Sequence, residues 1–252
     1  MSLTVVVGAA RGIGRAIAEE LGSSDPTQPL LLADIDGEQV AELASILAAD
    51  GVDVTATTVN VADANSVAAL VAQSRSADKV AIAAGVFRTS SALTTSVSEF
   101  EEVLGVNTIG CFHIAQQYAA AMTEAGGGAI VAVASIAARM PRMRQAAYSA
   151  SKAALRQAPR VLAMEVAEFG VRINTVSPGA TDTWMMRQLA SDHSSVADLA
   201  GGSLDALRPR IPAGRVAAAE DIASVVSFLL SPGSRHIVMG DIVVDGGELL
   251  GM

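Results

Sequence analysis

The chain has 252 residues and a net charge of −9; apolar residues make up 51% of it and aromatic residues only 3%. This length and composition suit one α/β domain, with a core built mainly from Ala, Val, Leu, Ile and Met. The acidic balance, without any Lys/Arg run, argues against nucleic-acid binding. No apolar run reaches the ~20 residues that span a bilayer. The single cysteine, Cys111, excludes a disulfide framework within the chain, so we expect a buried thiol and a cytoplasmic protein without a secretory signal.

Strand-like and helix-like segments alternate along the chain. Short apolar, β-branched runs predict strands at 3–7, 30–33, 52–59, 80–83, 129–133, 171–176 and 242–244. Ala-rich stretches with helical spacing predict helices at 15–21, 39–49, 66–74, 103–124, 150–169 and 219–230. The alternation predicts a single α/β domain over residues 1–252, with a doubly wound parallel sheet and helices on both faces. The long strand-free stretch at 183–212 is a candidate lid over a site.

A glycine-rich loop follows the first predicted strand. Gly8, Gly12 and Gly14 allow a tight turn, and they let the backbone and the N-terminus of the next helix approach a pyrophosphate. Such a loop alone is weak evidence, but the second strand ends in Asp34, twenty residues after Gly14, where a carboxylate can accept hydrogen bonds from the ribose hydroxyls. Together these features predict a Rossmann-type dinucleotide site.

Asp34 also bears on the choice of cofactor. Its carboxylate would repel a 2′-phosphate and occupy the space that the phosphate needs, which favours NAD over NADP. Arg11, in the glycine loop, favours NADP instead, because a guanidinium there could pair with that phosphate. We give Asp34 more weight and expect NAD.

Tyr148 and Lys152 are spaced i, i+4, so that both side chains lie on one face of a helix. A nearby ammonium stabilises a phenolate and lowers its pKa, which would make Tyr148 a usable general base. The alternative is an incidental pair on an ordinary amphipathic helix. Ser135 weakens that alternative, because it follows the strand at 129–133 and lies at the carboxyl edge of the sheet, where α/β sites form.

At these residues the chain resembles the short-chain dehydrogenase/reductase family. The likeness extends from residue 3 to about 250 and includes Asn107, Pro178-Gly179 and Thr183 in the positions of family motifs. It implies that Tyr148 is the acid/base and that Lys152 lowers its pKa and holds the nicotinamide ribose. It also implies that Ser135 orients the substrate, that Asn107 supports a proton relay, and that the protein is a homotetramer built on the helices at 103–124 and 150–169. The residues expected to bind the cofactor are Gly8, Arg11, Gly12, Ile13, Gly14, Asp34, Asn60, Val61, Ala84, Gly85, Tyr148, Lys152, Pro178, Gly179, Thr181 and Thr183.

Three positions depart from the family pattern. Val7 replaces a threonine, the segment 82–85 lacks the usual pair of asparagines, and Asn60 replaces an aspartate that meets the adenine amine. The amide oxygen of Asn60 can still accept that hydrogen bond. We expect these changes to affect local stability and adenine contacts rather than the chemistry.

Within the family, the chain is similar to the dehydrogenases that aromatise a carboxylated cyclic diol to a catechol in siderophore biosynthesis. Segments 60–64, 83–88 and 127–135 carry much of this likeness. A carboxylated substrate needs a local cation in so acidic a protein, and Arg88 and Arg142 follow the fourth and fifth strands. Arg139 and Arg144 are weaker candidates for this contact.

Apolar side chains of the strand-free stretch are candidates to cover the substrate ring. Trp184, Met185, Met186 and Leu189 have near-helical spacing, and packing against the domain or a partner subunit is an equal alternative for them. Among the four, Met185 is the expected substrate contact.

Other functions stay open. The chain could act on another cyclic or acyl alcohol or ketone, as a 3-oxoacyl reductase does, or it could be a non-catalytic NAD-binding sensor. No metal is expected, because His113, His193 and His236 have no metal-ligand spacing.

Overall fold

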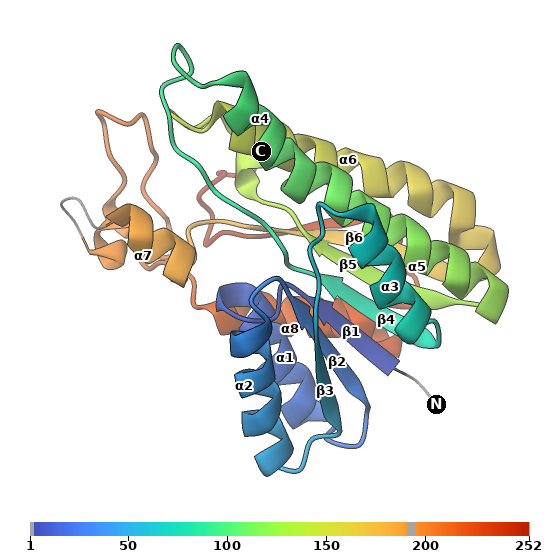
Figure 1. Ribbon diagram of the computed structural model, residues 1–252. Helices are drawn as coiled ribbons and strands as arrows, with labels where there is room; N and C mark the ends of the chain where they lie inside the picture. The colour runs from blue at the N-terminus through green and yellow to red at the C-terminus, as the bar shows by residue number, and fades with distance from the viewer. Residues whose placement is uncertain (1–2, 191–194, 252) are drawn as a thin grey trace.

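The computed structural model describes residues 3–190 and 195–251, in which seven parallel strands form one sheet in the order β3-β2-β1-β4-β5-β6-β7 (Figure 1). The strands are β1 Leu3–Val7, β2 Leu30–Asp34, β3 Val54–Thr58, β4 Ala77–Ile82, β5 Gly128–Val133, β6 Val171–Pro178 and β7 Asp241–Val244. The helices are α1 Gly12–Ser24, α2 Gly37–Ala49, α3 Ala64–Gln73, α4 Val97–Leu104, α5 Cys111–Ala125, α6 Ala146–Val166, α7 Trp184–Ala190 and α8 Ala219–Leu230. The predicted doubly wound parallel sheet is confirmed.

Helices cover both faces of the sheet (Figure 1). One core cluster packs α1, α2 and α8 on the first face, with Ile17, Leu43 and Ile222 fully or almost fully buried. The other packs α3, α5 and α6 on the second face, around Tyr118 and Leu155. Because both faces are covered, the central strands are apolar at almost every position.

The strand order reverses between β1 and β4. From β1 the chain builds outward to β2 and β3, and it then crosses to β4 on the other side of β1. The loops after β1 and β4 therefore leave in opposite directions and open a crevice at the carboxyl ends of the strands, which is where α/β proteins bind ligands.

The helix expected at 103–124 differs most from the prediction. It begins earlier, at Val97, because the Ser96 hydroxyl accepts a hydrogen bond from the Glu99 backbone N–H at 3.1 Å and caps the helix. A π-helical turn at Gly105–Gly110 separates α4 from α5. A Cβ on Gly110 would collide with the Val61 carbonyl, so this turn packs directly against the loop after β3.

The expected buried thiol is observed, since Cys111 is fully buried and burial raises its pKa to about 11. Among the described residues, no helix is both long enough and apolar enough to cross a membrane.

Candidate active site

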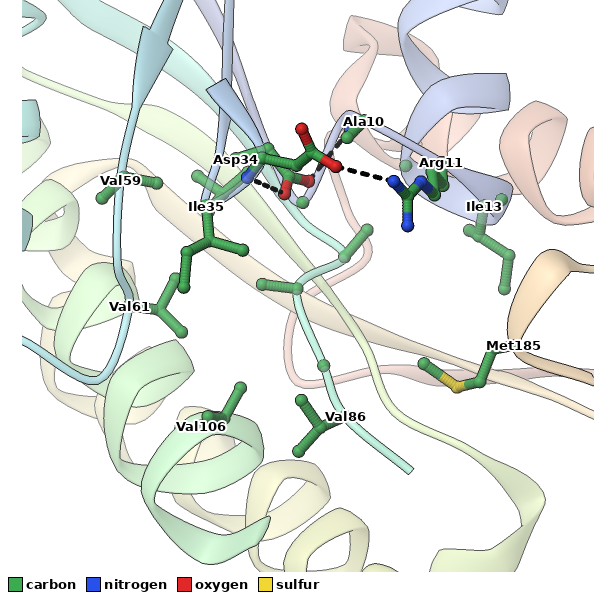
Figure 2. A pocket seen from close by; sticks show the side chains of 18 of the residues that line it. Ala10, Arg11, Ile13, Asp34, Ile35, Val59, Val61, Val86, Val106 and Met185 are labelled. Carbon is green, nitrogen blue, oxygen red and sulfur yellow. Dashed lines mark hydrogen bonds and ion pairs between the residues drawn. The ribbon is translucent and has the colours of Figure 1, made fainter. Parts of the chain in front are cut away.

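A cavity of about 400 Å³ lies at the switch point, against the carboxyl ends of β1, β2 and β4 (Figure 2). The glycine loop forms one side of it. A Cβ on Gly8, which has a φ of +85°, would collide with the Ala84 backbone, and a Cβ on Gly14 would collide with the Gly8 carbonyl. These two glycines let the loop, the start of α1 and the end of β4 pack backbone to backbone, which leaves room for a phosphate group at the helix N-terminus.

Asp34 lies at the end of this cavity beside β2 (Figure 2). Its carboxylate oxygens accept hydrogen bonds from the backbone N–H groups of Ala10, at 2.9 Å, and Asp36, at 3.0 Å. Arg11 does not pair with Asp34. Its guanidinium donates to the Asp36 carboxylate at 2.6 Å and to the Gln39 amide oxygen at 2.8 Å, so its charge is already partly neutralised.

The opposite walls of the cavity are apolar. Figure 2 shows Ile35, Val59 and Val61 beside Asp34, with Val86 and Val106 further along the cavity. This arrangement forms a slot for a flat ring next to a carboxylate. Asn60 also lines the slot, but its amide oxygen accepts a 3.0 Å hydrogen bond from the Ala62 N–H and thereby shapes the loop.

A second cavity, of about 450 Å³, adjoins the first, and both are lined by Thr183 and Met185. The structure brings Ser135, Tyr148 and Lys152 together on its wall. Other expected cofactor and lid residues also line it, namely Ile13, Gly85, Pro178, Gly179, Thr181 and Met186. The cavity formed by the glycine loop and Asp34 thus adjoins a pocket that contains the Tyr148 phenol.

Tyr148 lies in the first turn of α6, and its ring packs edge-on against Phe87 with 4.5 Å between centroids. Lys152, one turn later, places Nζ 5.8 Å from the Tyr148 ring centroid and donates to the Val133 carbonyl at 2.8 Å. Burial raises the pKa of Tyr148, while a hydrogen bond with the Ser135 hydroxyl acts in the opposite direction. Burial likewise lowers the pKa of Lys152. Burial is therefore the largest influence on the pKa of Tyr148, whereas the spacing of Tyr148 and Lys152 had pointed only to an effect of the ammonium.

Asn107 is fully buried in the π-helical turn. Its amide oxygen accepts from the Val86 N–H at 2.7 Å, and its Nδ2 donates to the Val86 carbonyl at 2.9 Å and to the Ser151 hydroxyl at 3.0 Å. Asn107 thus joins the segment after β4 to α6, the helix that presents Tyr148.

The two arginines predicted to bind the substrate lie in different places. Arg142 lines the second cavity, whereas Arg88 does not line it and instead donates to Glu102 at 2.6 Å. The loop after β4 turns Arg88 outward, and sequence spacing could not show that direction. Arg144 lines the cavity, while Arg139 is bound to Asp241 at 2.6 Å.

Sequence reasoning missed two charged residues of the second cavity. Arg208, from the stretch at 183–212, and Glu248, from the segment after β7, both line it. The Gly246-Gly247 turn before Glu248 was the only local signal. His193 and the side chain of Leu189 lie outside the described residues, and in the part of the chain that is described no cluster of side chains could hold a metal ion.

The sequence is similar to a known family and to named enzymes over nearly its whole length. The family model for enoyl-(acyl carrier protein) reductase matches residues 8–248. The 2,3-dihydro-2,3-dihydroxybenzoate dehydrogenase of Bacillus subtilis is 34% identical over 99% of this chain and 97% of its own. The enzyme of the same name from Escherichia coli is 39% identical over 76% of this chain and 79% of its own.

Solved structures agree with this fold. Levodione reductase superposes with a TM-score of 0.90 at 26% identity, covering 100% of this chain and 98% of its own. A structure from Beutenbergia cavernae, described as an NAD(P)-dependent gluconate 5-dehydrogenase with bound NADP, has a TM-score of 0.89 at 32% identity, covering 99% of this chain and 97% of its own. With its fold and nearly its whole length matched, the chain belongs to the short-chain dehydrogenase/reductase family, whose members are oxidoreductases that bind a nicotinamide cofactor.

Proposed function

We propose that this protein uses NAD to oxidise a ring alcohol, and that its substrate is 2,3-dihydro-2,3-dihydroxybenzoate, which becomes 2,3-dihydroxybenzoate in catechol siderophore biosynthesis. One observation carries the proposal: a pocket beside the dinucleotide slot combines the Tyr148 phenol with the Arg142 guanidinium. Such a pocket suits an alcohol that also bears a carboxylate. The relatives from B. subtilis and E. coli, which carry the name of this activity, support the same substrate.

The residues of the first cavity fit a dinucleotide. The glycine loop packs so closely against β4 and α1 that a Cβ at Gly8 or Gly14 would collide with backbone, and Asp34 offers a carboxylate to the ribose hydroxyls. NAD is favoured over NADP because Asp36 adds a second carboxylate beside Asp34, while Arg11 is held by Asp36 and Gln39. Lys152, Thr181 and Thr183 would hold the nicotinamide end. When bound, the nicotinamide ring supplies the acceptor for the hydride.

The chain's own part in the reaction is to move a proton. As the hydride leaves the C3 carbinol carbon, the alcohol proton passes to the Tyr148 oxygen and a ketone forms. Ser135 would hold the substrate oxygen against Tyr148, and Asn107, which fixes the segment after β4, would support the relay that carries the proton away. The ketone then enolises: the ring loses a proton from C2 to solvent, the C3 oxygen takes one up, and the aromatic catechol that results makes the oxidation favourable.

Arginines would bind the carboxylate of the substrate. Nη1 of Arg142 is buried and has no hydrogen-bond partner among the described residues. Because an unpaired buried donor destabilises a fold, such a group is expected to meet a ligand. Arg144 lies on the same wall with a φ of +64°, a strained conformation for a residue other than glycine. We propose Arg142 as the principal contact and Arg144 as a second one, whereas Arg88 pairs with Glu102 and does not line this cavity.

The described part of the stretch at 183–212 contributes Met185, Met186 and Leu199 to the second cavity. We propose that these side chains cover the substrate ring.

We also propose a cytoplasmic homotetramer that uses α5 and α6. Val161 and Met164 leave an apolar surface on α6 that is 50% and 69% exposed.

The direct test is to mix the protein with NAD and the dihydrodiol acid and to follow NADH absorbance and catechol fluorescence. We expect both signals to rise together. Turnover of an acyl thioester but not of the diol would favour the second candidate, because the 3-oxoacyl-[acyl-carrier-protein] reductase of Pseudomonas aeruginosa is 31% identical over 97% of this chain. Cofactor binding without turnover of any alcohol would favour a sensor.

A further inference from the structure

Glu248 is a fully buried carboxylate in the wall of the second cavity. One of its oxygens, Oε1, accepts a hydrogen bond from Arg142 Nη2 at 2.7 Å and another from Arg208 Nε at 3.0 Å. The other oxygen, Oε2, accepts from the Ala180 backbone N–H at 3.3 Å. The chain thus brings a residue of the C-terminal segment, one of the loop after β5 and one of the stretch at 183–212 to a single point.

The backbone around Glu248 is shaped for this contact. Gly246 and Gly247 have φ values of +61° and +88°, and Asp245 accepts hydrogen bonds from the N–H groups of Gly247 and Leu249, both at 2.8 Å. Gly179 makes room on the other side, because a Cβ there would lie 3.1 Å from Glu248 Oε2. The carboxylate is therefore held from both sides and has little freedom to turn.

The Glu248 carboxylate faces two guanidiniums, and the exposed fraction of the side chain is 10% for Arg142 and 17% for Arg208. The Asp245 carboxylate also lies close enough to raise the pKa of Arg142. Burial and the neighbouring Arg208 lower the pKa of Arg142, whereas Glu248 raises it. Without Glu248 the two like charges would repel each other across a poorly solvated wall. With it, Arg142 is fixed through Nη2, while its buried Nη1 has no hydrogen-bond partner in the part of the chain that the structure describes.

We propose that Glu248 is a positioning residue that holds Arg142 and Arg208 on one of its oxygens. The two guanidiniums together then select a substrate that bears a carboxylate. Arg208 is the specificity-determining contact of the pair. This inference rests on the proposed function, because it names the residues that recognise the acid. It does not depend on which carbon of the ring is oxidised.

The experiment compares binding of 2,3-dihydroxybenzoate with binding of catechol, which lacks the carboxylate, by calorimetry in the presence of NAD. The variants are Glu248→Gln, Arg208→Gln and Arg208→Lys, and the matched control is Arg210→Gln, which removes the same charge from an exposed position outside the cavity. We expect Glu248→Gln and Arg208→Gln to reduce the preference for the acid about tenfold while catechol affinity stays the same. Arg208→Lys should restore part of the preference, and Arg210→Gln should leave it intact.

Kinetics add a second readout. Glu248→Gln should raise KM for the dihydrodiol acid much more than it lowers kcat, with KM for NAD unchanged. If Glu248→Gln does not fold, the two Arg208 variants decide. An acid preference equal to that of the wild type in Arg208→Gln would overturn the proposal, as would a wild type that binds both ligands equally. A wild type that prefers the acid but oxidises no cyclic diol would refute the proposed function. It would still support recognition of a carboxylate by Glu248, Arg142 and Arg208.

Discussion

Tyr148 occupies an environment that opposes its own ionisation. Burial raises the pKa of the phenol, and the hydrogen bond with Ser135 lowers it. Lys152 is itself buried, with Nζ bonded to the Val133 carbonyl. The pKa of Tyr148, the proposed general base, is therefore set by a balance between burial, which raises it, and the hydrogen bond with Ser135, which lowers it.

The pH dependence of alcohol oxidation should reveal this balance. Since the phenolate takes the proton, kcat/KM should rise with pH up to the pKa of Tyr148. Ser135→Ala removes the bond that lowers that pKa, so the rising limb should move to higher pH and kcat should fall by about a hundredfold. Ser149→Ala, one residue from Tyr148, is the control and should leave the limb in place. An unmoved limb in Ser135→Ala would show that Ser135 does not tune the phenol.

Asp34 should govern the choice between NAD and NADP. Asp34→Asn removes the charge that repels a 2′-phosphate, so kcat/KM with NADP should rise about tenfold or more relative to NAD. Glu38→Gln removes a charge from an exposed site on α2 outside the cavity and should change neither value. A wild type that already prefers NADP would contradict our assignment.

Part of the site could be inferred from sequence because its spacing is local. Tyr148 and Lys152 share one helical face, and Ser135 directly follows a strand, so regular geometry predicts where they lie. Arg88 and Glu248 show the limit of that reasoning. The direction of Arg88 depends on how an irregular loop turns, and Glu248 meets Arg142 across more than a hundred residues of sequence.

At the scale of elements, the start of α7 is joined to the glycine loop. The Arg11 guanidinium lies 5.0 Å from the centroid of the Trp184 ring while it also binds Asp36. A cation–π contact of this kind contributes about 0.5–1 kcal/mol when exposed. Trp184 also lines the first cavity, so the contact connects α7 to the place where a dinucleotide would bind.

Trp184 is the only tryptophan of the chain, so its fluorescence reports directly on this contact. NADH binding should quench the Trp184 emission. Arg11→Ala should shift the emission of the free protein and weaken NADH binding several-fold, since α7 loses its contact with the loop. Arg15→Ala, in the first turn of α1 and paired with Glu19, should change neither the emission nor the NADH affinity. Identical spectra for Arg11→Ala and wild type would exclude the contact in solution.

Element types were predictable because strands buried on both faces and amphipathic helices have clear periodicities. The residues at which the helices and strands begin and end were less predictable. The strand expected at 52–59 forms only at Val54–Thr58, and the helix expected at 103–124 gains a turn at its start from the Ser96 cap. The π-helical turn has no periodic signature, because it arises from tertiary packing of Gly110 against Val61.

At the scale of the whole molecule, Asp241 connects the last strand to the rest of the fold. Its side chain is 1% exposed and accepts hydrogen bonds from Ser177 at 2.7 Å, Thr175 at 2.9 Å, and Arg139 and Arg156, both at 2.6 Å. Burial alone would raise the pKa of Asp241, but these four partners outweigh it and hold the pKa below its usual value. The ionised form is therefore part of the folded structure.

Asp241→Asn should lower the free energy of unfolding at pH 7 by about 2–4 kcal/mol, because it removes the buried negative charge that Arg139 and Arg156 share. A lowered pKa stabilises the fold above the unfolded value of about 3.9, and this contribution is lost as the pH falls through the lower folded value. The difference between variant and wild type should therefore narrow below about pH 4. Urea unfolding at pH 7 and below about pH 4 measures this difference in free energy, and the exposed Asp205→Asn is the control. A difference that stays constant with pH would argue against this role.

In the proposed reaction the Tyr148 oxygen receives the alcohol proton. The decisive measurement is turnover of the dihydrodiol acid with NAD by Tyr148→Phe, made together with calorimetric titration of NADH. The phenyl ring keeps the packing against Phe87, so we expect NADH affinity within about twofold of the wild type and kcat lowered at least about a thousandfold. A variant that binds NADH normally and still oxidises the diol at a tenth of the wild-type rate or more would contradict the account.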